Sequence, residues 1–179
     1  VITVLGAAGG VIDVTSGVST DTLTFASPGA VAFTGAGPRT LVLKGGTTGN
    51  SVFNPVIGDA GSDAVSVAKG GAGSWVLGSA NTYTGGTTLT DGILILDKAT
   101  TPLGTGTFTL QGGTLRVGSS LASISLANAV TVSDRYPKFD GTKDITFSGT
   151  VGMDLDAGND GTLDAMPWKE LLDSVAFVR

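Results

Sequence analysis

A nine-residue unit occurs twice in the sequence, and this recurrence constrains the fold more than any other sequence feature. Residues 88–96 (TLTDGILIL) align without a gap with residues 109–117 (TLQGGTLRV). Both copies have the pattern of a strand, a glycine-containing turn and a second strand. Their offset, about 21 residues, is typical of one coil of a β-solenoid, in which equivalent apolar side chains of successive coils stack. We therefore expect an all-β solenoid with about 21 residues per coil.

Short bursts of alternating apolar and polar residues run through most of the chain. Examples are VITV at 1–4, TLVL at 40–43, ILIL at 93–96, TLRV at 114–117 and DITF at 144–147. Such alternation indicates strands, and Gly, Asn, Ser and Pro separate the bursts. If the whole chain coiled, it would form about eight coils and a rod about 40 Å long, at roughly 4.8 Å per coil.

The composition supports a folded protein with few charges. Glycine accounts for 29 of the 179 residues, 41% of the residues are hydrophobic and only 14% are charged. A disordered chain would combine high charge with few apolar residues. The net charge of -5 argues against nucleic acid as a partner. A helix needs roughly 20 consecutive apolar residues to cross a bilayer, and because no apolar run comes close to that length we expect no membrane-spanning helix.

The chain contains no His and no Cys. These residues are the ones most used for proton shuttling, thiol chemistry and transition-metal binding at neutral pH. Their absence excludes whole classes of enzyme and any disulfide framework. We expect a protein that is not an enzyme.

The segment from Lys69 to Leu89 (KGGAGSWVLGSANTYTGGTTL), followed by Gly92-Ile93-Leu94, resembles the autotransporter-associated β-strand repeat. The Trp, the Asn-Thr-Tyr-Thr-Gly-Gly run and the following Gly-x-Leu all occur in the family's order. The resemblance covers about residues 38–132. It implies a right-handed, single-stranded parallel β-helix, of the kind found in passenger regions of secreted or surface-displayed bacterial proteins, and it implies no enzymatic activity.

The domain organisation follows from the extent of these signals. We expect residues 1–163 to form the β-solenoid, with the strongest repeat signal in residues 38–132. For residues 1–37, where that signal fades, an all-β sandwich is an alternative to the solenoid. The chain begins with Val1 and not with Met, so we expect that a leader has been removed or that this is a piece of a longer protein.

Residues 164–179 differ in character from the rest. Asp164 is suited to cap a short C-terminal helix with Pro167 in its first turn. In that helix Leu171, Leu172 and Val175 would share one face. This segment is a cap on the open end of the solenoid, a docking element for another subunit, or a disordered tail.

A cluster of acidic residues near the C-terminus is a candidate calcium site. Its carboxylates are Asp154, Asp156, Asp160 and Asp164. The cluster has the D-x-D opening of a calcium loop, but Ala165 stands where the bidentate Glu belongs. A polar, turn-rich loop is the alternative interpretation. No other cofactor is expected.

Two further acidic groupings could serve a carbohydrate-cleaving site. They are Asp59 with Asp63, and Asp134-Arg135 with Asp140. Glycoside cleavage needs carboxylates that face each other across the sugar bond. The spacing does not show that either group converges on one face, so surface turns are the alternative interpretation.

The leading functional hypothesis is a non-enzymatic structural protein: a β-solenoid rod segment on the surface of a bacterium or secreted from it. Such a rod is suited to end-to-end self-association into filaments or a surface layer, or to association with other surface proteins. The alternatives are an adhesin passenger fragment and a carbohydrate-binding or carbohydrate-cleaving β-helix. A glycan partner would need exposed aromatic side chains, for which the candidates are Trp75, Tyr83, Tyr136 and Trp168.

Overall fold

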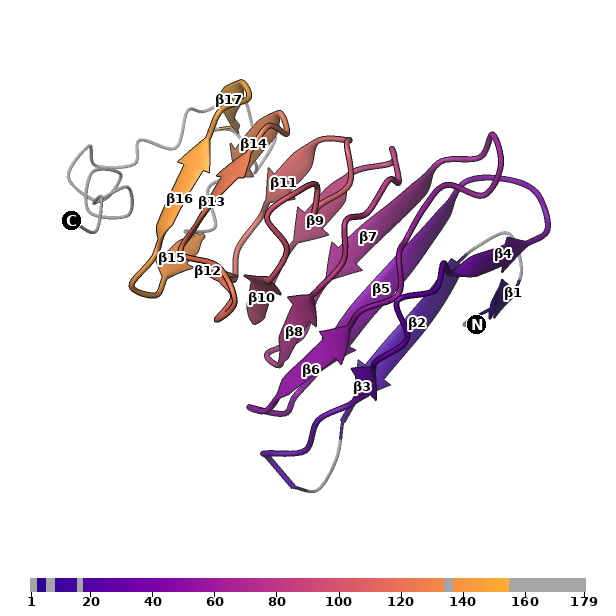
Figure 1. Ribbon diagram of the computed structural model, residues 1–179, viewed down its shortest axis with the longest axis horizontal. Coiled ribbons are helices and arrows are strands. Elements are labelled where there is room, and N and C mark those ends of the chain that lie inside the picture. The colour runs from indigo at the N-terminus through magenta and orange to yellow at the C-terminus, as the bar shows by residue number, and fades with distance from the viewer. Residues whose placement is uncertain (1–2, 6–8, 16–17, 134–136, 155–179) are drawn as a thin grey trace, which may run out of the picture.

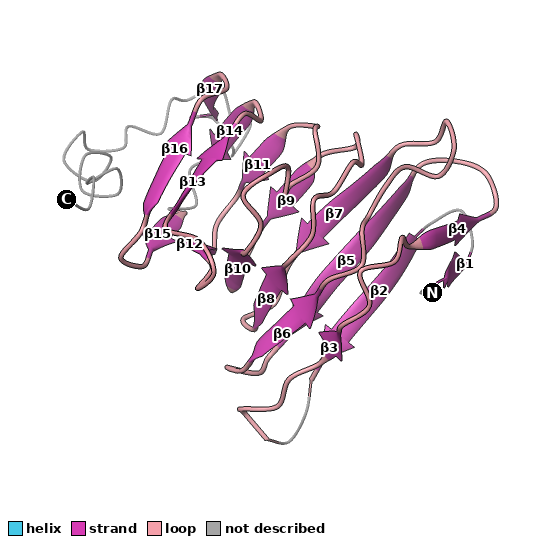
Figure 2. Cartoon of the chain, in the orientation of Figure 1, coloured by secondary structure: helices cyan, strands magenta, loops and turns pink. Residues whose placement is uncertain are grey.

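The computed structural model describes residues 3–5, 9–15, 18–133 and 137–154, and every regular element in them is a β-strand (Figures 1 and 2). The expected all-β class is therefore confirmed. The strands are β1 (Thr3–Leu5), β2 (Gly9–Val14), β3 (Thr24–Phe25), β4 (Ala32–Thr34), β5 (Arg39–Gly45), β6 (Asn50–Phe53), β7 (Val65–Lys69), β8 (Ser74–Leu77), β9 (Thr87–Leu89), β10 (Ile93–Leu96), β11 (Phe108–Leu110), β12 (Thr114–Val117), β13 (Ser123–Leu126), β14 (Val130–Ser133), β15 (Lys138–Asp140), β16 (Asp144–Phe147) and β17 (Val151–Asp154).

The strands form a parallel β-solenoid with three faces. The first face is a seven-stranded sheet in the order β17-β14-β11-β9-β7-β5-β2, and the second is a six-stranded sheet in the order β15-β12-β10-β8-β6-β3. The third face consists mainly of extended loops. Two further two-stranded parallel sheets, β1 with β4 and β13 with β16, are formed by strands that directly precede a strand of the seven-stranded sheet. The chain visits the three faces in turn, so each coil lies directly on the preceding one (Figure 1).

The duplicated unit of the sequence occupies neighbouring coils in parallel register. Thr88 pairs with Thr109 across β9 and β11, and Leu94 pairs with Leu115 across β10 and β12. The offset between the two copies in the sequence is therefore the length of one coil here. This pairing confirms the prediction on which the solenoid interpretation rested.

Alternation along each strand separates an apolar interior from a polar exterior. In the seven-stranded sheet, Leu41, Val67, Thr87, Phe108 and Val130 stack in one inward row and are all buried. In the six-stranded sheet, Phe53, Leu77 and Leu96 form another such row. Stacking of like side chains gives one continuous core along the axis.

The coils at the N-terminal end are longer than the period of the duplicated unit. Gly9 pairs with Thr40, and Arg39 pairs with Val65, because long connections separate the strands of these coils. The largest sheet therefore stacks seven strands within the described residues, fewer than the eight coils that a uniform period over the whole chain would give. Strands β2 and β3 belong to the stacked sheets, which favours a solenoid over the sandwich alternative for this region.

Tight corners between the faces require glycine at defined places. Gly86 has φ +87°, and a Cβ atom there would lie 2.6 Å from the carbonyl oxygen of Thr107 in the next coil. The preceding Gly85 would place a Cβ atom 2.3 Å from the hydroxyl of Ser66. Glycine is therefore required at both positions of this corner.

Candidate functional site

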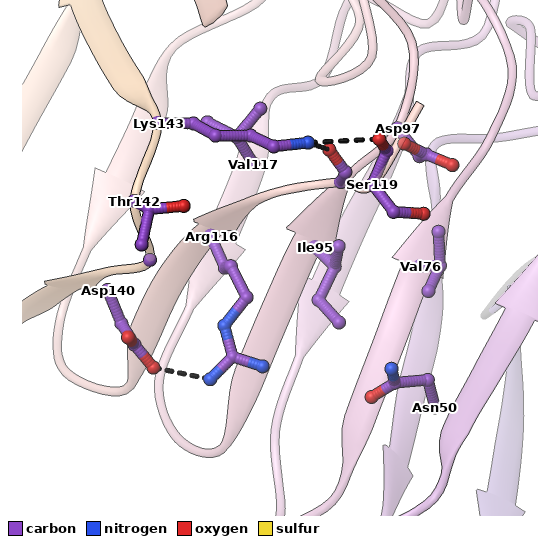
Figure 3. A pocket seen from close by; sticks show the side chains of 12 residues that line it. Asn50, Val76, Ile95, Asp97, Arg116, Val117, Ser119, Asp140, Thr142 and Lys143 are labelled. Atoms are coloured by element: carbon purple, nitrogen blue, oxygen red, sulfur yellow. Dashed lines mark hydrogen bonds and ion pairs between the residues drawn. The ribbon is translucent and has the colours of Figure 1, made fainter. Parts of the chain in front are cut away.

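A groove of about 460 Å³ lies on the outer face of the six-stranded sheet (Figure 3). Its floor is an outward row in which Val76, Ile95, Arg116 and Asp140 lie in register on β8, β10, β12 and β15. Ile95 is only 5% exposed although it faces outward. Because each coil supplies one residue of the row, the groove exists only when the coils are stacked.

An ion pair closes one end of the groove. Arg116 Nη2 donates a hydrogen bond to Asp140 Oδ2, and this bond, together with the charge of Arg116, lowers the pKa of the Asp140 carboxyl (Figure 3). The two side chains are 33% and 50% exposed. Water therefore screens the pair, and such pairs contribute at most about 1 kcal/mol. Of the predicted grouping of Asp134, Arg135 and Asp140, only Asp140 lies within the described residues.

Two charged side chains on the rim bond the backbone of a neighbouring coil. Lys143 Nζ donates hydrogen bonds to the carbonyls of Gly118 at 2.6 Å and Ser119 at 3.0 Å. Asp97 Oδ1 accepts from the N–H of Ser120 at 2.9 Å and from its hydroxyl at 2.6 Å. Acid–base or nucleophilic catalysis needs such groups to face a substrate. In this groove they instead hold one coil to the next.

The aromatic residues of the repeat motif lie in the core. Trp75 is 1% exposed and donates from Nε1 to the Lys44 carbonyl at 3.1 Å. Tyr83 is fully buried, with its hydroxyl 2.5 Å from Thr87 Oγ1, and burial raises the pKa of Tyr83. Neither ring is placed to stack on a sugar. The other two candidates, Tyr136 and Trp168, lie outside the described residues.

Asn81 of the same motif joins three successive coils. Its Oδ1 accepts a hydrogen bond from the N–H of Ile57 in the preceding coil at 2.9 Å. Its Nδ2 donates to the carbonyl of Pro102 in the following coil at 2.7 Å. Both bonds cross between coils, so the Asn81 side chain pairs backbone groups of its two neighbouring coils.

The acidic pair Asp59 and Asp63 stabilises loops. Asp59 Oδ1 accepts from the N–H groups of Val65 and Thr84, both at 2.9 Å. Partial burial raises the pKa of Asp59, but these bonds outweigh it and the net shift is downward. Asp63 Oδ2 accepts from the N–H of Gly37 at 2.6 Å. Each carboxylate is held by backbone donors, as expected for turn residues.

The calcium candidate falls almost wholly outside the described residues. Only Asp154 is reached, as the last residue of β17. Asp156, Asp160 and Asp164 lie beyond it. Within the ranges that the structure describes, no three acidic side chains gather into a metal site. Calcium binding by this cluster stays a prediction.

Lys69 is a buried charged residue that the sequence interpretation missed. It occupies an inward row between Leu43 and Leu89 and is 0% exposed. Its Nζ donates to the carbonyls of Gly70 and Gly71, both at 2.8 Å, and of Asp91 at 2.9 Å. Burial lowers the pKa of Lys69 to about 8, while the charge of Asp91 acts in the opposite direction. The signal was present in the sequence, because Lys69 is in phase with Val65 and Val67.

Comparisons with known proteins agree with this geometry. Residues 67–96 match the family model of the passenger-associated-transport-repeat. Over 75 residues the chain is 39% identical to the adhesin BmaC autotransporter of Brucella suis biovar 1 (strain 1330). That alignment covers 37% of this chain but only 2% of the length of the relative. No solved structure gave a significant match.

The matched residues begin within β7 and end at the last residue of β10, so they contain the buried Trp75, Tyr83 and Asn81 and more than one full coil. The described residues include no helix that could span a lipid bilayer. The resemblance to autotransporter repeats is therefore confirmed: residues 67–96 match the passenger-associated-transport-repeat model and lie within a parallel β-solenoid.

Proposed function

We propose that this chain is a rod segment of a bacterial surface protein, in which it acts as a non-enzymatic passenger scaffold. The observation that carries the proposal is the unbroken parallel register of the seven-stranded sheet from β2 to β17. A stack of this kind grows along one axis and interacts mainly between neighbouring coils. It therefore suits a spacer that holds another part of a protein away from the cell.

The comparisons support the surface location. The repeat family is described as passenger-associated, and the similar Brucella protein is an adhesin autotransporter. Because the alignment spans 2% of that adhesin, the similarity concerns a short stretch of a much longer chain. A scaffold segment is the role that such a short, repeated stretch fits best.

The chemistry of the outer surface supports a scaffold role. In the groove, the charged side chains Arg116, Asp140, Lys143 and Asp97 bond one another or the backbone of the adjacent coil. The aromatic side chains of the repeat lie in the core. These placements weaken the carbohydrate-binding alternative, because Trp75 was its best residue.

Duplication of one coil tests the scaffold role. Residues 87–107 run from the start of β9 to the residue before β11 and form one complete coil. A chain carrying two copies should fold, keep its β-sheet circular dichroism and lengthen by roughly 4.8 Å in small-angle scattering. An unfolded or unlengthened product would contradict a modular rod.

Antibody labelling of intact cells that make the protein tests the location. We expect labelling without permeabilisation and loss of the epitope after brief external protease treatment. Labelling that needs permeabilised cells would contradict the passenger role while leaving the rod geometry intact.

A further inference from the structure

The corner between β9 and β10 has the sequence Asp91-Gly92. On either side of it, the N–H groups of Thr90 and Ile93 donate to carbonyls of the preceding coil at 2.9 and 3.2 Å. The peptide group between Asp91 and Gly92 bonds two side chains instead. Its N–H donates to Oδ1 of Asp91 itself at 2.7 Å, and its carbonyl accepts from Lys69 Nζ at 2.9 Å. A side chain therefore acts on each end of this one peptide group.

The bond from the Gly92 N–H brings together two groups that react with each other. Oδ1 is bonded directly to the carboxyl carbon Cγ, so the Gly92 nitrogen lies beside the carbon that it would attack. Gly92 has no side chain to shield its nitrogen, and a Cβ atom there would lie 2.3 Å from the carbonyl oxygen of Gly71. Asp91 is exposed, so water reaches it. The corner is therefore arranged for closure of a succinimide ring.

We propose that Asp91 converts spontaneously to isoaspartate in the folded protein, and that the ammonium group of Lys69 promotes this reaction. The Gly92 nitrogen attacks Cγ of the protonated Asp91 carboxyl group. A bond forms between that nitrogen and Cγ, the bond from Cγ to the hydroxyl breaks, and the amide proton leaves with the hydroxyl as water.

The second step returns the water. It adds to the former main-chain carbonyl carbon of Asp91, the bond from that carbon to the Gly92 nitrogen breaks, and a proton from the water restores the N–H. The net change is an isomerisation that consumes no other reactant. Afterwards the main chain runs through Cβ and Cγ of residue 91, and the corner is longer by one carbon atom.

Lys69 lies where the first step develops negative charge. When the Gly92 nitrogen loses its proton, the charge of the amide anion is shared with the Asp91 carbonyl oxygen, to which Lys69 Nζ already donates. Donors held in place before the reaction stabilise such charge most effectively where water is excluded, and Lys69 is 0% exposed. Burial lowers the pKa of Lys69 to about 8, so the ammonium form still predominates at neutral pH.

The product supplies an anion that Lys69 lacks in the starting chain. The ion pairs found within the described residues do not include Lys69, whose Nζ bonds three neutral carbonyls. In isoaspartate the former Asp91 carbonyl becomes a carboxylate, so a negative charge forms at the oxygen to which Lys69 donates. A buried charge is costly unless it is paired. The ring should therefore open to isoaspartate in preference to aspartate.

A second Asp-Gly pair within the described residues, Asp140-Gly141, provides an internal comparison. The Asp140 carboxyl also accepts from the N–H of Gly141, but Arg116 holds it as a carboxylate by a hydrogen bond and lowers its pKa. A carboxylate is a poor electrophile, because it has no hydroxyl to lose as water. Asp140 should therefore isomerise more slowly than Asp91 in the folded protein.

Ageing of the full chain at neutral pH, folded or in enough urea to abolish its β-sheet circular dichroism, tests the proposal. Trypsin releases Asp91 within residues 70–98 and Asp140 within residues 139–143. Electron-transfer mass spectrometry then locates isoaspartate in each peptide. In urea the two sites should isomerise at similar rates, because a glycine follows each. Folding should raise the ratio of isoaspartate at residue 91 to that at residue 140 several-fold, and a ratio that stays the same or falls would overturn the proposal.

Lys69→Met separates promotion of the reaction from simple support of the corner. We expect isomerisation of Asp91 in the folded variant to slow several-fold, with unchanged rates in urea. If Lys69 only held the corner in place, its removal would free the Asp91-Gly92 peptide group, and an unchanged or faster rate would overturn its assigned role. Lys44→Met, which removes an exposed lysine, is the matched control and should leave the rate at Asp91 unchanged. If Lys69→Met does not keep its β-sheet circular dichroism, the ratio measured in the unmodified chain decides alone.

Discussion

Asp97 Oδ1 lies 2.0 Å from the position that a Cβ atom on Gly118 would occupy in the next coil. The same arrangement occurs two coils earlier, where Asn54 Oδ1 lies 2.1 Å from a Cβ position on Gly78. In each case a side chain at the end of one strand covers a glycine at the equivalent place in the following coil. The glycines are therefore required by close approach between coils.

Gly118→Ala should destabilise the protein, because the added methyl group would meet Asp97 from Oδ1 back to Cβ. Overpacking of this kind costs about 1–3 kcal/mol. Displacement of Asp97 would also weaken its bonds to Ser120. Urea unfolding measures the change. Gly118→Ala should cost less stability in a chain that also carries Asp97→Ala, because the side chain that the methyl group would meet is gone. Strictly additive changes in the free energy of unfolding would contradict the explanation.

Asn81→Ala should lower the free energy of unfolding by about 2–4 kcal/mol, because it leaves the buried N–H of Ile57 and carbonyl of Pro102 without their bonds. Asn81→Asp keeps the acceptor and loses the donor, but it also buries a carboxyl group. The loss of stability in Asn81→Asp should therefore come from the Pro102 carbonyl, which no longer receives a hydrogen bond. Hydrogen exchange at the Ile57 amide separates the two variants, with fast exchange expected only for Asn81→Ala.

Lys69 should make stability depend on alkaline pH. Its pKa is about 8 in the folded protein against an ordinary 10.5, so the unfolded chain binds more protons between these values. Stability should therefore rise with pH across this window, by at most about 3 kcal/mol. Below pH 8 the buried ammonium persists and its penalty is constant. In Lys69→Met the free energy of unfolding should vary less over the same window, and an identical slope would contradict the assignment.

Thr101→Asn should stabilise the protein. Thr101 has φ +44°, a left-handed conformation that a β-branched residue adopts only under strain. Its carbonyl accepts hydrogen bonds from the N–H groups of Asn81 and Gly104, which hold it there. Asparagine tolerates this conformation, so we expect a gain of about 1 kcal/mol. The neighbouring exposed Thr100→Asn is the matched control and should change the melting temperature little.

The stacked coils could be predicted because their signal is local and repeated. The unit at residues 88–96 and its copy at 109–117 showed the coil length, and the pairing of Thr88 with Thr109 follows from it. The long coils near the N-terminus could not be predicted in this way. Their lengths depend on connections such as residues 54–64, which carry no repeat.

The polar contacts of the candidate groove could not be predicted from the sequence, for a different reason. Arg116 and Asp140 lie in different coils, and nothing in their separation shows that they share a face. Their meeting depends on the register of β12 with β15, in which the paired residues are 24 positions apart in the sequence and not 21 as in the repeated unit. The buried position of Lys69 could have been predicted from the sequence, because strict alternation with Val65 and Val67 places its side chain inward.

The bonds of Asn81 to both neighbouring coils have a mechanical consequence. Hydrogen bonds between coils run nearly along the axis of the rod. A pull on its two ends, as in flowing liquid, would load these bonds directly. Separating one coil from the next would then require the interstrand hydrogen bonds of that coil and the Asn81 bonds to break together. The rod should therefore extend under force in discrete steps of one coil.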